Sequence, residues 1–248
     1  MKLLDQFRAA GRGYLGRHEA RLACRRGQMA FYYGLAALAD LAALLGILLL
    51  AARPERPEVG LVVALGTLAV AVGLPVASAV GLMIPARAGE KADGTLEALM
   101  LTPVSRREVL WAKLVGRMRP ARCFLAAAAP AYALCGLAPA VAGAAGTADP
   151  GEAAIIAVLG GAAGLLAAGL LWLVVLADSH CAAAVTLYCS AWAGSPLKAT
   201  VAAAAAVLAP PVVLSCCYGL GLPYHFIAGP VMFSELVRNL DRFTIEQP

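Results

Sequence analysis

Apolar runs long enough to cross a bilayer constrain the fold of this chain more than any other feature. The first run covers residues 28–52, and the second covers 59–86 and is interrupted by Pro75. A helix of about 25 residues is roughly 38 Å long, whereas the hydrocarbon core of a bilayer is about 30 Å thick. Because a segment in lipid must satisfy its own backbone hydrogen bonds, these runs predict transmembrane α-helices.

The composition supports the same fold class. Hydrophobic residues make up 61% of the 248 residues and charged residues only 14%, whereas a soluble domain is about half apolar and a quarter charged. Ala, Leu, Val and Gly dominate, and small residues of this kind let membrane helices approach one another closely. We therefore expect an all-α fold, that of a polytopic helical membrane protein.

Three later runs add further spans. The run at 120–145 contains several prolines, which membrane helices tolerate when neighbouring helices satisfy the freed carbonyl groups. The run that starts near Ala153 is either a span ending near Ala177 with an interfacial helix after it, or one long tilted helix reaching Ser190. A fifth span is predicted at 199–222.

The last apolar stretch, residues 222–237, is short for a span and is broken by Pro223 and Pro230. Arg238 and Arg242 follow it and favour a return to the cytoplasmic side. The alternatives are a re-entrant or interfacial segment, or a C-terminus cut short of a full last helix. We therefore expect five to six transmembrane helices.

The distribution of basic residues predicts the orientation. Seven of the twenty Lys and Arg residues precede residue 27, eight lie between Arg87 and Arg122, and none lies between 123 and 197. Basic loops remain in the cytoplasm, so the N-terminus and the segment between the second and third runs are predicted to be cytoplasmic. The turn at 146–152 has no Lys or Arg and is predicted to lie outside.

This orientation predicts a multi-pass protein of the cell membrane, plasma or inner, surrounded by the lipid bilayer. Arg53 and Arg56 are the exception to the charge rule, and Glu55 and Glu58 accompany them. Nucleic acid is not an expected partner, because no basic face carries interleaved stacking aromatic residues.

The chain is expected to have two parts, a basic N-terminal helix at 1–27 and a single transmembrane domain at 28–248. The apolar side chains of the first part fall on one helical face, which predicts an amphipathic helix on the cytoplasmic membrane surface. That pattern weakens after Leu15, and the alternative is a solvated basic leader that only sets the orientation. The members of the apolar face are Leu3, Leu4, Phe7, Tyr14 and Leu15.

A polar segment at 87–113 interrupts the apolar sequence and is predicted to contain two short helical pieces. Asp93-Gly94-Thr95 can start the first piece, and Thr102-Pro103 stops it, because the residue before proline avoids the helical region. Ser105 and Glu108 then match a capping box, which predicts a second helix from about Arg106. Its Lys and Arg residues are expected to snorkel to the lipid headgroups, and they are Lys113, Arg117, Arg119 and Arg122. The alternative is a basic loop that only fixes topology.

The sequence from Glu90 to Lys113 resembles the cytoplasmic signature of type-2 ABC exporter permeases. In both, a Glu is followed by Gly-Thr-Leu-Glu, a Leu run, Thr-Pro, Ser and Arg residues and then a Lys, between the second and third spans. The resemblance implies a permease subunit that forms the translocation path and contacts a separate ATPase through a short coupling helix. The residues implied in this contact are Glu90, Asp93, Gly94, Thr95, Glu97, Thr102, Pro103, Arg106, Arg107 and Glu108.

The resemblance also implies partners and cofactors. The chain lacks GxxxxGK[ST] and so has no phosphate-binding loop of its own. ATP and Mg²⁺ are therefore expected on a partner ATP-binding ABC subunit, with no cofactor and no catalytic residue on this chain. The expected assembly also includes a second permease copy or a homologous permease subunit.

Two intramembrane acids, Asp40 and Asp178, are candidates for the translocation path, because ionisable groups in spans are commonly functional. For Asp40 the alternative is a protonated carboxyl group bonded to a neighbouring helix, or a packing contact where two permease copies meet. For Asp178 the alternative is a position wet by headgroups. A membrane-embedded enzyme using Asp40, Asp178 and His180, or a structural membrane protein, remains the alternative function. A metal site is not expected, since the three scattered His residues form no HExxH. The Gly160–Gly164 pair is expected to serve helix packing within the chain.

Overall fold

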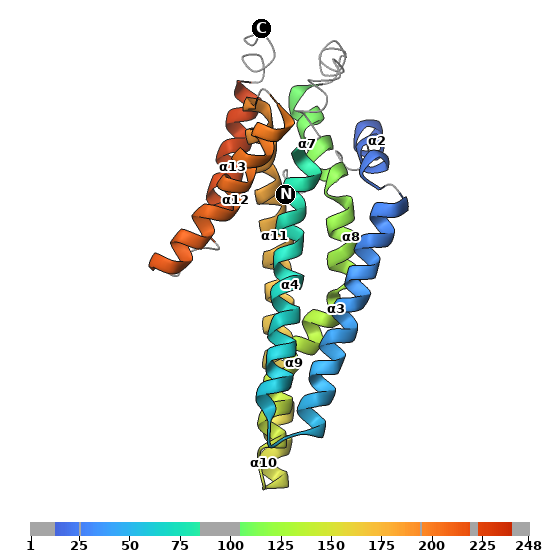
Figure 1. Ribbon diagram of the computed structural model, residues 1–248, viewed down its shortest axis with the longest axis vertical. Helices are drawn as coiled ribbons and strands as arrows, with labels where there is room; N and C mark the ends of the chain where they lie inside the picture. Colours follow the sequence, from blue (N-terminus) through green and yellow to red (C-terminus); the bar gives the residue numbers. More distant parts are fainter. Residues whose placement is uncertain (1–12, 25, 85–104, 194, 219–222, 240–248) are drawn as a thin grey trace. The chain divides into compact units, whose positions relative to one another are not determined.

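The computed structural model describes residues 13–24, 26–84, 105–193, 195–218 and 223–239, and in these ranges every regular element is helical (Figure 1). The predicted all-α class is therefore confirmed. In chain order the elements are α2 (Tyr14–Ala23), α3 (Arg26–Ala52), α4 (Pro57–Met83), α7 (Arg106–Arg117), α8 (Arg119–Ala127), α9 (Ala129–Ala145), α10 (Pro150–Ile155), the π-helix η2 (Ile156–Gly160), α11 (Gly161–Trp192), α12 (Pro196–Tyr218) and α13 (Pro223–Arg238).

Three helical stretches are long and apolar enough to cross a membrane, and they cover Gly27–Ala52, Pro57–Met83 and Pro150–Trp192. The pair Arg107–Ala127 and Ala129–Ala145, which is bent by 43°, would make a fourth. A polytopic helical membrane protein is therefore confirmed, whereas the described residues supply three or four of the expected five to six spans.

The structure decides between the alternatives for the later runs. The run that begins near residue 153 ends in one continuous helix, α11, which reaches Trp192, so the prediction of one long helix is confirmed. The described apolar part of α12, Pro196–Val207, is shorter than a span. Helix α13 has 16 residues and would be roughly 24 Å long, less than the hydrocarbon thickness.

The chain forms two compact units. Unit 1 comprises Met1–Gln28, Val76–Ala121 and Ala177–Pro248, and unit 2 comprises Met29–Pro75 and Arg122–Leu176. Unit 2 therefore contains most of α3, α4, α8 and α9, together with α10, η2 and the first half of α11. Unit 1 contains α2, α7, α12, α13 and the remaining parts of α4, α8 and α11.

Unit 2 is built from long apolar helices that pack through small residues. A Cβ atom added to Gly164 of α11 would lie 2.0 Å from the backbone oxygen of Gly136 in α9, so only glycine permits this crossing. The glycine-rich stretch thus packs within the chain, as predicted. The outer faces of the helices carry exposed Leu and Val side chains suited to lipid, among them Leu38, Leu41, Leu45, Val62 and Leu65.

The two turns of unit 2 lie at the same end of its helices. One turn joins α3 to α4 around Arg53–Arg56, and the other joins α9 to α10 around 146–149 (Figure 1). Asp149 caps α10 by accepting a hydrogen bond from the backbone N–H of Gly151, at 2.9 Å. The turn at 146–149, which is predicted to lie outside, and the basic turn at Arg53–Arg56 therefore lie together at one end of unit 2.

Pro75 deprives one backbone carbonyl group of α4 of its donor within the helix, and a side chain of a neighbouring helix supplies a donor instead. Pro75 lies inside the helix and cannot donate to the carbonyl of Ala71, four residues earlier. The hydroxyl group of Tyr132 in α9 donates to that carbonyl instead, at 2.7 Å. Helix α4 therefore continues through Pro75, although the sequence suggested an interruption there.

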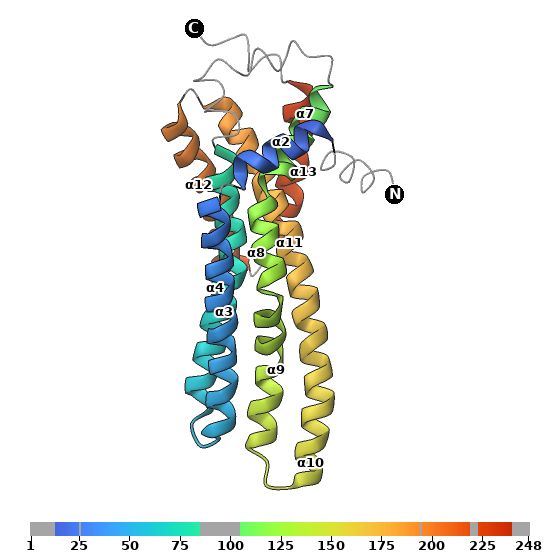
Figure 2. The same ribbon diagram turned by 90° about the vertical axis from the view of Figure 1, so that its right-hand side faces the viewer.

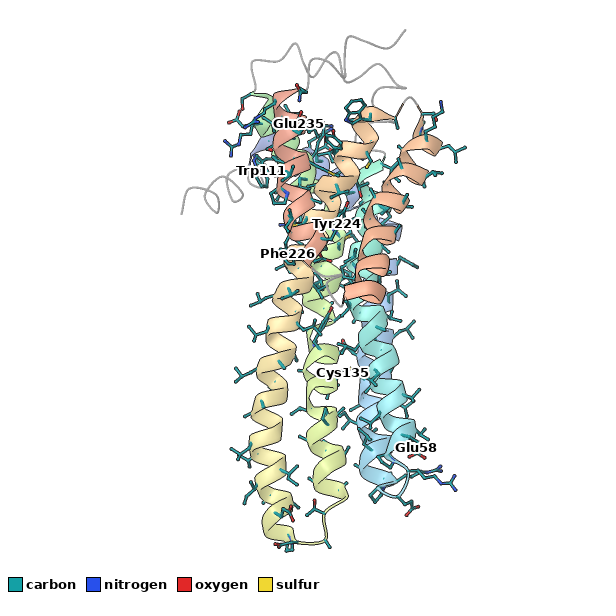
Figure 3. All side chains as sticks on the ribbon, turned by 90° about the vertical axis from the view of Figure 1, so that its left-hand side faces the viewer. Glu58, Trp111, Cys135, Tyr224, Phe226 and Glu235 are labelled. Carbon is teal, nitrogen blue, oxygen red and sulfur yellow. The ribbon has the colours of Figure 1, made fainter. Side chains whose placement is uncertain are left out.

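Backbone groups at the break between α8 and α9 are likewise hydrogen-bonded by side chains of two other helices. The indole N–H of Trp172 in α11 donates to the carbonyl of Leu125 at 2.8 Å. On the other side of the break, a carboxylate oxygen of Asp40 in α3 accepts from the backbone N–H of Ala131 at 2.9 Å. Cys135, one turn further along α9, donates its thiol to the carbonyl of Ala64, and it points toward α4 in Figure 3.

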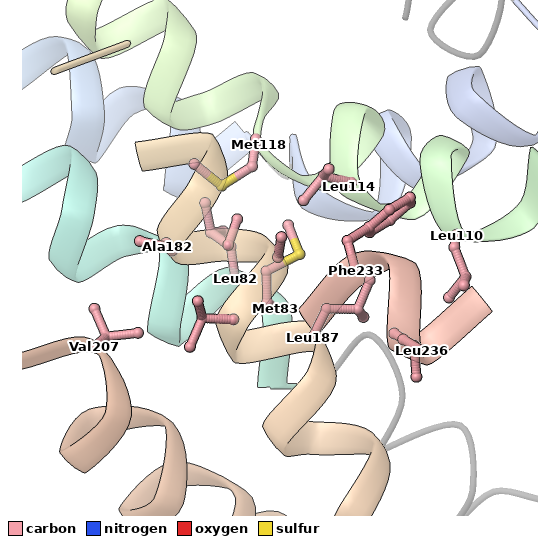
Figure 4. Packing of buried hydrophobic residues seen from close by; sticks show 14 of the residues in the cluster. Leu82, Met83, Leu110, Leu114, Met118, Ala182, Leu187, Val207, Phe233 and Leu236 are labelled. Carbon is pink, nitrogen blue, oxygen red and sulfur yellow. The ribbon is translucent and has the colours of Figure 1, made fainter. Parts of the chain in front are cut away.

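Unit 1 has its own apolar core, shown in Figure 4. Leu110 and Leu114 of α7 contribute one edge of this core, and Phe233 and Leu236 of α13 contribute another. The part of α11 in this unit contributes Leu187, whose side chain is fully buried. The end of α4 contributes Leu82 and Met83, and α12 contributes Val207.

Candidate coupling site

Helix α7 starts with a complete capping box, which confirms the prediction from Ser105 and Glu108. The Ser105 hydroxyl oxygen accepts from the backbone N–H of Glu108 at 3.3 Å, and the Glu108 carboxylate accepts from the Ser105 N–H at 3.2 Å. Each partner satisfies a donor that the helix start leaves without an intrahelical acceptor. The polar segment thus ends in a helix with a defined first residue, Arg106.

The other predicted coupling residues divide into two groups. Arg107 and Glu108 lie in the first turn of α7, where both side chains are exposed. Arg106 begins the same helix. The remaining members of the prediction lie outside the described residues, and they are Glu90, Asp93, Gly94, Thr95, Glu97, Thr102 and Pro103.

Helix α2 packs on α7 through a face that the sequence pattern did not reveal. Figure 2 shows α2 crossing α7. The buried residues of α2 are Gly16, Glu19, Ala20 and Ala23, whereas Tyr14 is 77% exposed. The pattern of large apolar side chains does weaken after Leu15, yet α2 continues to Ala23, because small residues and one acid form its buried face.

A buried ion-pair cluster joins the two helices. The ammonium of Lys113 lies 3.1 Å from one carboxylate oxygen of Glu19, and Nε of Arg117 lies 2.7 Å from the other. The side chain of Lys113 is 2% exposed and that of Glu19 is 6% exposed. The prediction that these two basic residues snorkel to headgroups is wrong, since Glu19 offers a closer counter-charge inside the protein.

The electrostatics of this cluster favour an ionised carboxylate. Burial alone would raise the pKa of Glu19, but the positive charges of Lys113 and Arg117 and their hydrogen bonds outweigh it. The pKa of Glu19 is therefore held below its ordinary value. Two cations share one anion here, and removing that anion would cost both of them their ion pair with Glu19.

Glycine at position 116 allows the two backbones to meet. A Cβ atom at Gly116 would lie 2.7 Å from Cβ of Glu19 and 2.7 Å from the backbone oxygen of Gly16. Real Cβ atoms do not approach so closely, so any larger residue would push α2 away. The close approach of α7 to α2 thus depends on Gly116 as well as on the ion pairs.

Another face of α7 binds the rest of unit 1. Leu110 and Leu114, four residues apart, are buried in the core of that unit. The ring of Trp111 lies 4.7 Å from that of Phe233, centroid to centroid, and Figure 3 shows Trp111 against α13. Helix α7 is therefore held on one side by ion pairs and on another by apolar packing.

The two candidate translocation acids belong to different units. Asp40 lies in unit 2, where its carboxylate accepts from the N–H of Ala131. Asp178 lies in unit 1, inside the continuous helix α11, and is 5% exposed. A headgroup-wetted position for Asp178 is therefore wrong. Among the described residues no cluster of three or more His, Cys, Asp or Glu side chains could hold a metal ion.

Sequence reasoning missed Glu19 as a site residue. It lies 94 residues before Lys113, and no local pattern connects residues so far apart. One signal was available, because Glu19 is one of only two acids among the first 27 residues and stands among arginines. An acid in a basic leader, on a helix face of Gly and Ala, suggests a buried contact rather than a solvated one.

A comparison with protein families identifies the chain. The family model described as ABC-2 family transporter protein matches residues 18–231 and so covers most of the 248 residues, including most of α2 and all of α7. No curated protein and no solved structure matches the chain. The chain therefore belongs to the ABC-2 transporter family, as a multi-pass membrane permease subunit of an ABC transporter and not its ATPase.

Proposed function

We propose that this chain forms the translocation path of an ATP-driven exporter and couples to a separate ATP-binding subunit through segment 87–113. The partner hydrolyses ATP with Mg²⁺ on the cytoplasmic side of the cell membrane, where the N-terminus of the permease also lies. A second copy of the chain, or a homologous permease subunit, completes the pathway. Two such subunits rocking against each other would give alternating access.

The observation that carries this proposal is the fixed position of α7, the helix that follows the coupling residues directly. Its first turn is capped by Ser105 and Glu108, and its last turns are tied to α2 by Glu19. A force applied to the segment before Ser105 would therefore move α7 and α2 together. A loop that only connected two spans would need neither the cap nor the buried ion pairs.

The surface available to the ATPase has both signs of charge. Arg107 and Glu108 are exposed in the first turn of α7, and the segment before it contributes the acids Glu90, Asp93 and Glu97. Complementary charges on a partner would set the rate and the register of docking. Recognition of the ATPase would thus depend on acids and bases spread over both helical pieces.

The proposal is tested with Glu90→Ala, Gly94→Leu and Glu97→Ala in the full permease, coexpressed with an ATP-binding subunit encoded beside it. We expect each variant to insert in the membrane normally but to lose at least half of ATPase copurification or of permease-dependent ATP hydrolysis in proteoliposomes. Glu58→Ala, which removes an exposed acid of unit 2 outside this segment, is the matched control. Wild-type copurification and hydrolysis in all three variants would refute the coupling role.

A further inference from the structure

A cavity of about 560 Å³ lies within unit 1, between α7, α11 and α13. Its volume falls within the range of roughly 300–1,000 Å³ that is typical of small-molecule sites. The contact between α2 and α7 does not use this space, because Glu19, Lys113 and Gly116 do not line it, although Arg107 at the start of α7 does. The cavity therefore needs an explanation of its own.

The interior of the cavity is apolar. Trp111 and Leu114 of α7, Ala177 and Ala184 of α11, and Phe233 of α13 form its walls. The hydroxyl group of Ser234, which also lines it, already donates to the carbonyl of Val231. An occupant is thus expected to fill this space with hydrocarbon rather than with polar groups.

Among the residues that the structure describes, the fully charged side chains lining the cavity are both positive. Arg107, from the first turn of α7, and Arg238, the last residue of α13, contribute to this lining, and no described Asp or Glu does so. Arginine presents a planar fork of donors that matches a phosphate group. The same space therefore offers an apolar interior together with two groups suited to an anionic head.

The surroundings of α13 indicate where such an occupant would come from. Ile227 and Val231 are large apolar side chains on this helix, and each is at least 60% exposed. In a chain with helices of spanning length, exposed apolar side chains of this kind face lipid hydrocarbon. A lipid tail could therefore reach the cavity without crossing water.

We propose that this cavity binds one anionic phospholipid from the leaflet on the side of segment 87–113. One acyl chain fills the space beside Trp111 and Phe233, and the phosphate lies against Arg107 and Arg238. Basic pockets between membrane helices are suited to anionic headgroups for the same electrostatic reason. The lipid would then contact α7 directly and be a ligand of the permease, whatever its cargo.

The test uses the full chain purified in detergent and titrated with dioleoyl phosphatidylglycerol or with dioleoyl phosphatidylcholine. Bound lipid is counted by native mass spectrometry. We expect one tightly held phosphatidylglycerol per chain, bound about 30-fold more tightly than phosphatidylcholine, which corresponds to two arginine contacts. Equal affinity for the two lipids, or no retained lipid, would overturn the proposal.

Three variants locate the site. Arg107→Gln with Arg238→Gln should reduce the preference for phosphatidylglycerol to about twofold or less, and both side chains are exposed, so the fold should tolerate the change. Ala177→Trp, at an exposed position on the cavity wall, should weaken binding of both lipids at least tenfold. Arg17→Gln with Arg21→Gln removes an equal charge from the exposed face of α2 and should leave binding unchanged.

The variants also separate this site from unspecific lipid contact. Unchanged phosphatidylglycerol binding in Ala177→Trp would show that the lipid lies elsewhere. An equal loss in the control with Arg17→Gln and Arg21→Gln and in the variant with Arg107→Gln and Arg238→Gln would show that total charge, and not this cavity, holds the lipid. Because none of these measurements involves ATP or an ATPase, their outcome does not depend on the proposed coupling role.

Discussion

At the scale of single residues, Glu19 is the group on which the packing of the N-terminal helix depends most. It is buried, it bonds two cations, and its helix otherwise presents only Gly and Ala to α7. Apolar burial by such small side chains is slight, so the ion pairs carry much of the specificity of this contact. The contact thus depends on one residue to an unusual degree.

Replacing Glu19 with Gln should detach α2 from α7. Removing one partner of a buried ion pair costs about 3–5 kcal/mol, and here Lys113 and Arg117 would both lose their ion pair with Glu19. Amide hydrogen exchange within residues 17–23 should accelerate by about two to four orders of magnitude, which is the corresponding change in the opening equilibrium. The measurement is hydrogen–deuterium exchange read by mass spectrometry on the full chain in micelles.

Glu58→Gln provides the comparison for that experiment, since it neutralises an exposed acid in the first turn of α4. Exchange in α2 should be the same in this variant as in the unmodified protein. If Glu19→Gln exchanged no faster than Glu58→Gln, the ion pairs would not hold α2 in place.

The same carboxylate predicts a dependence on pH. The pKa of Glu19 is lower in the folded chain than its ordinary value, so its contribution to stability is complete above about pH 4.5 and is lost as the pH falls through the folded pKa. The melting temperature should therefore decline more steeply between about pH 5 and pH 3 for the unmodified protein than for Glu19→Gln. Parallel curves for the two proteins, recorded in the same detergent, would contradict this assignment.

At the scale of elements, the helices of unit 2 remain intact at their weak points because neighbouring helices complete their hydrogen bonds. The carbonyl of Ala71 accepts from Tyr132, that of Leu125 accepts from Trp172, and the N–H of Ala131 donates to Asp40. An unsatisfied backbone group inside a bilayer costs several kcal/mol. The prolines and the break between α8 and α9 are therefore tolerated only in this packed arrangement.

A double-mutant cycle can measure one of these bonds. Tyr132→Phe removes the donor to the carbonyl of Ala71 and should destabilise the protein by about 1–2 kcal/mol. Pro75→Ala restores a backbone N–H that can donate to the same carbonyl. In that background Tyr132→Phe should cost less than about 0.5 kcal/mol, as measured by denaturant unfolding in micelles. Equal costs in both backgrounds would mean that the tyrosine and the proline are not linked through this carbonyl.

Elements that depend on patterns between residues close in the sequence were predictable from the sequence. The capping box at Ser105 involves residues three positions apart, and the long apolar run predicts the helix α11, although its continuity past Ala177 was only one of two alternatives. The pairing of Glu19 with Lys113 was not predictable, because long-range partners are chosen by packing that only the folded chain contains. Likewise, Lys113 has the spacing of a residue at the membrane surface, and only the position of α2 shows that it is buried.

At the scale of the whole molecule, the charge distribution and the spans suggest one orientation. In unit 2 the basic turn at Arg53–Arg56 and the turn at 146–149 lie at the same end. The bases of the N-terminal region greatly outnumber those of the first turn, and the second turn has none. The proposed orientation therefore places both turns outside the cell, although one of them carries two arginines.

Site-specific labelling tests this orientation. In a chain whose native cysteines have been replaced, Ala148→Cys lies in the exposed turn before α10, and Arg21→Cys lies on exposed α2. A membrane-impermeant maleimide added to intact cells should label Ala148→Cys at once and Arg21→Cys only after permeabilisation. The basic residues near α2 would otherwise have to cross the membrane, which the positive-inside rule disfavours. Labelling of Arg21→Cys in intact cells, with Ala148→Cys protected, would reverse the orientation and remove the cytoplasmic ATPase from reach of segment 87–113.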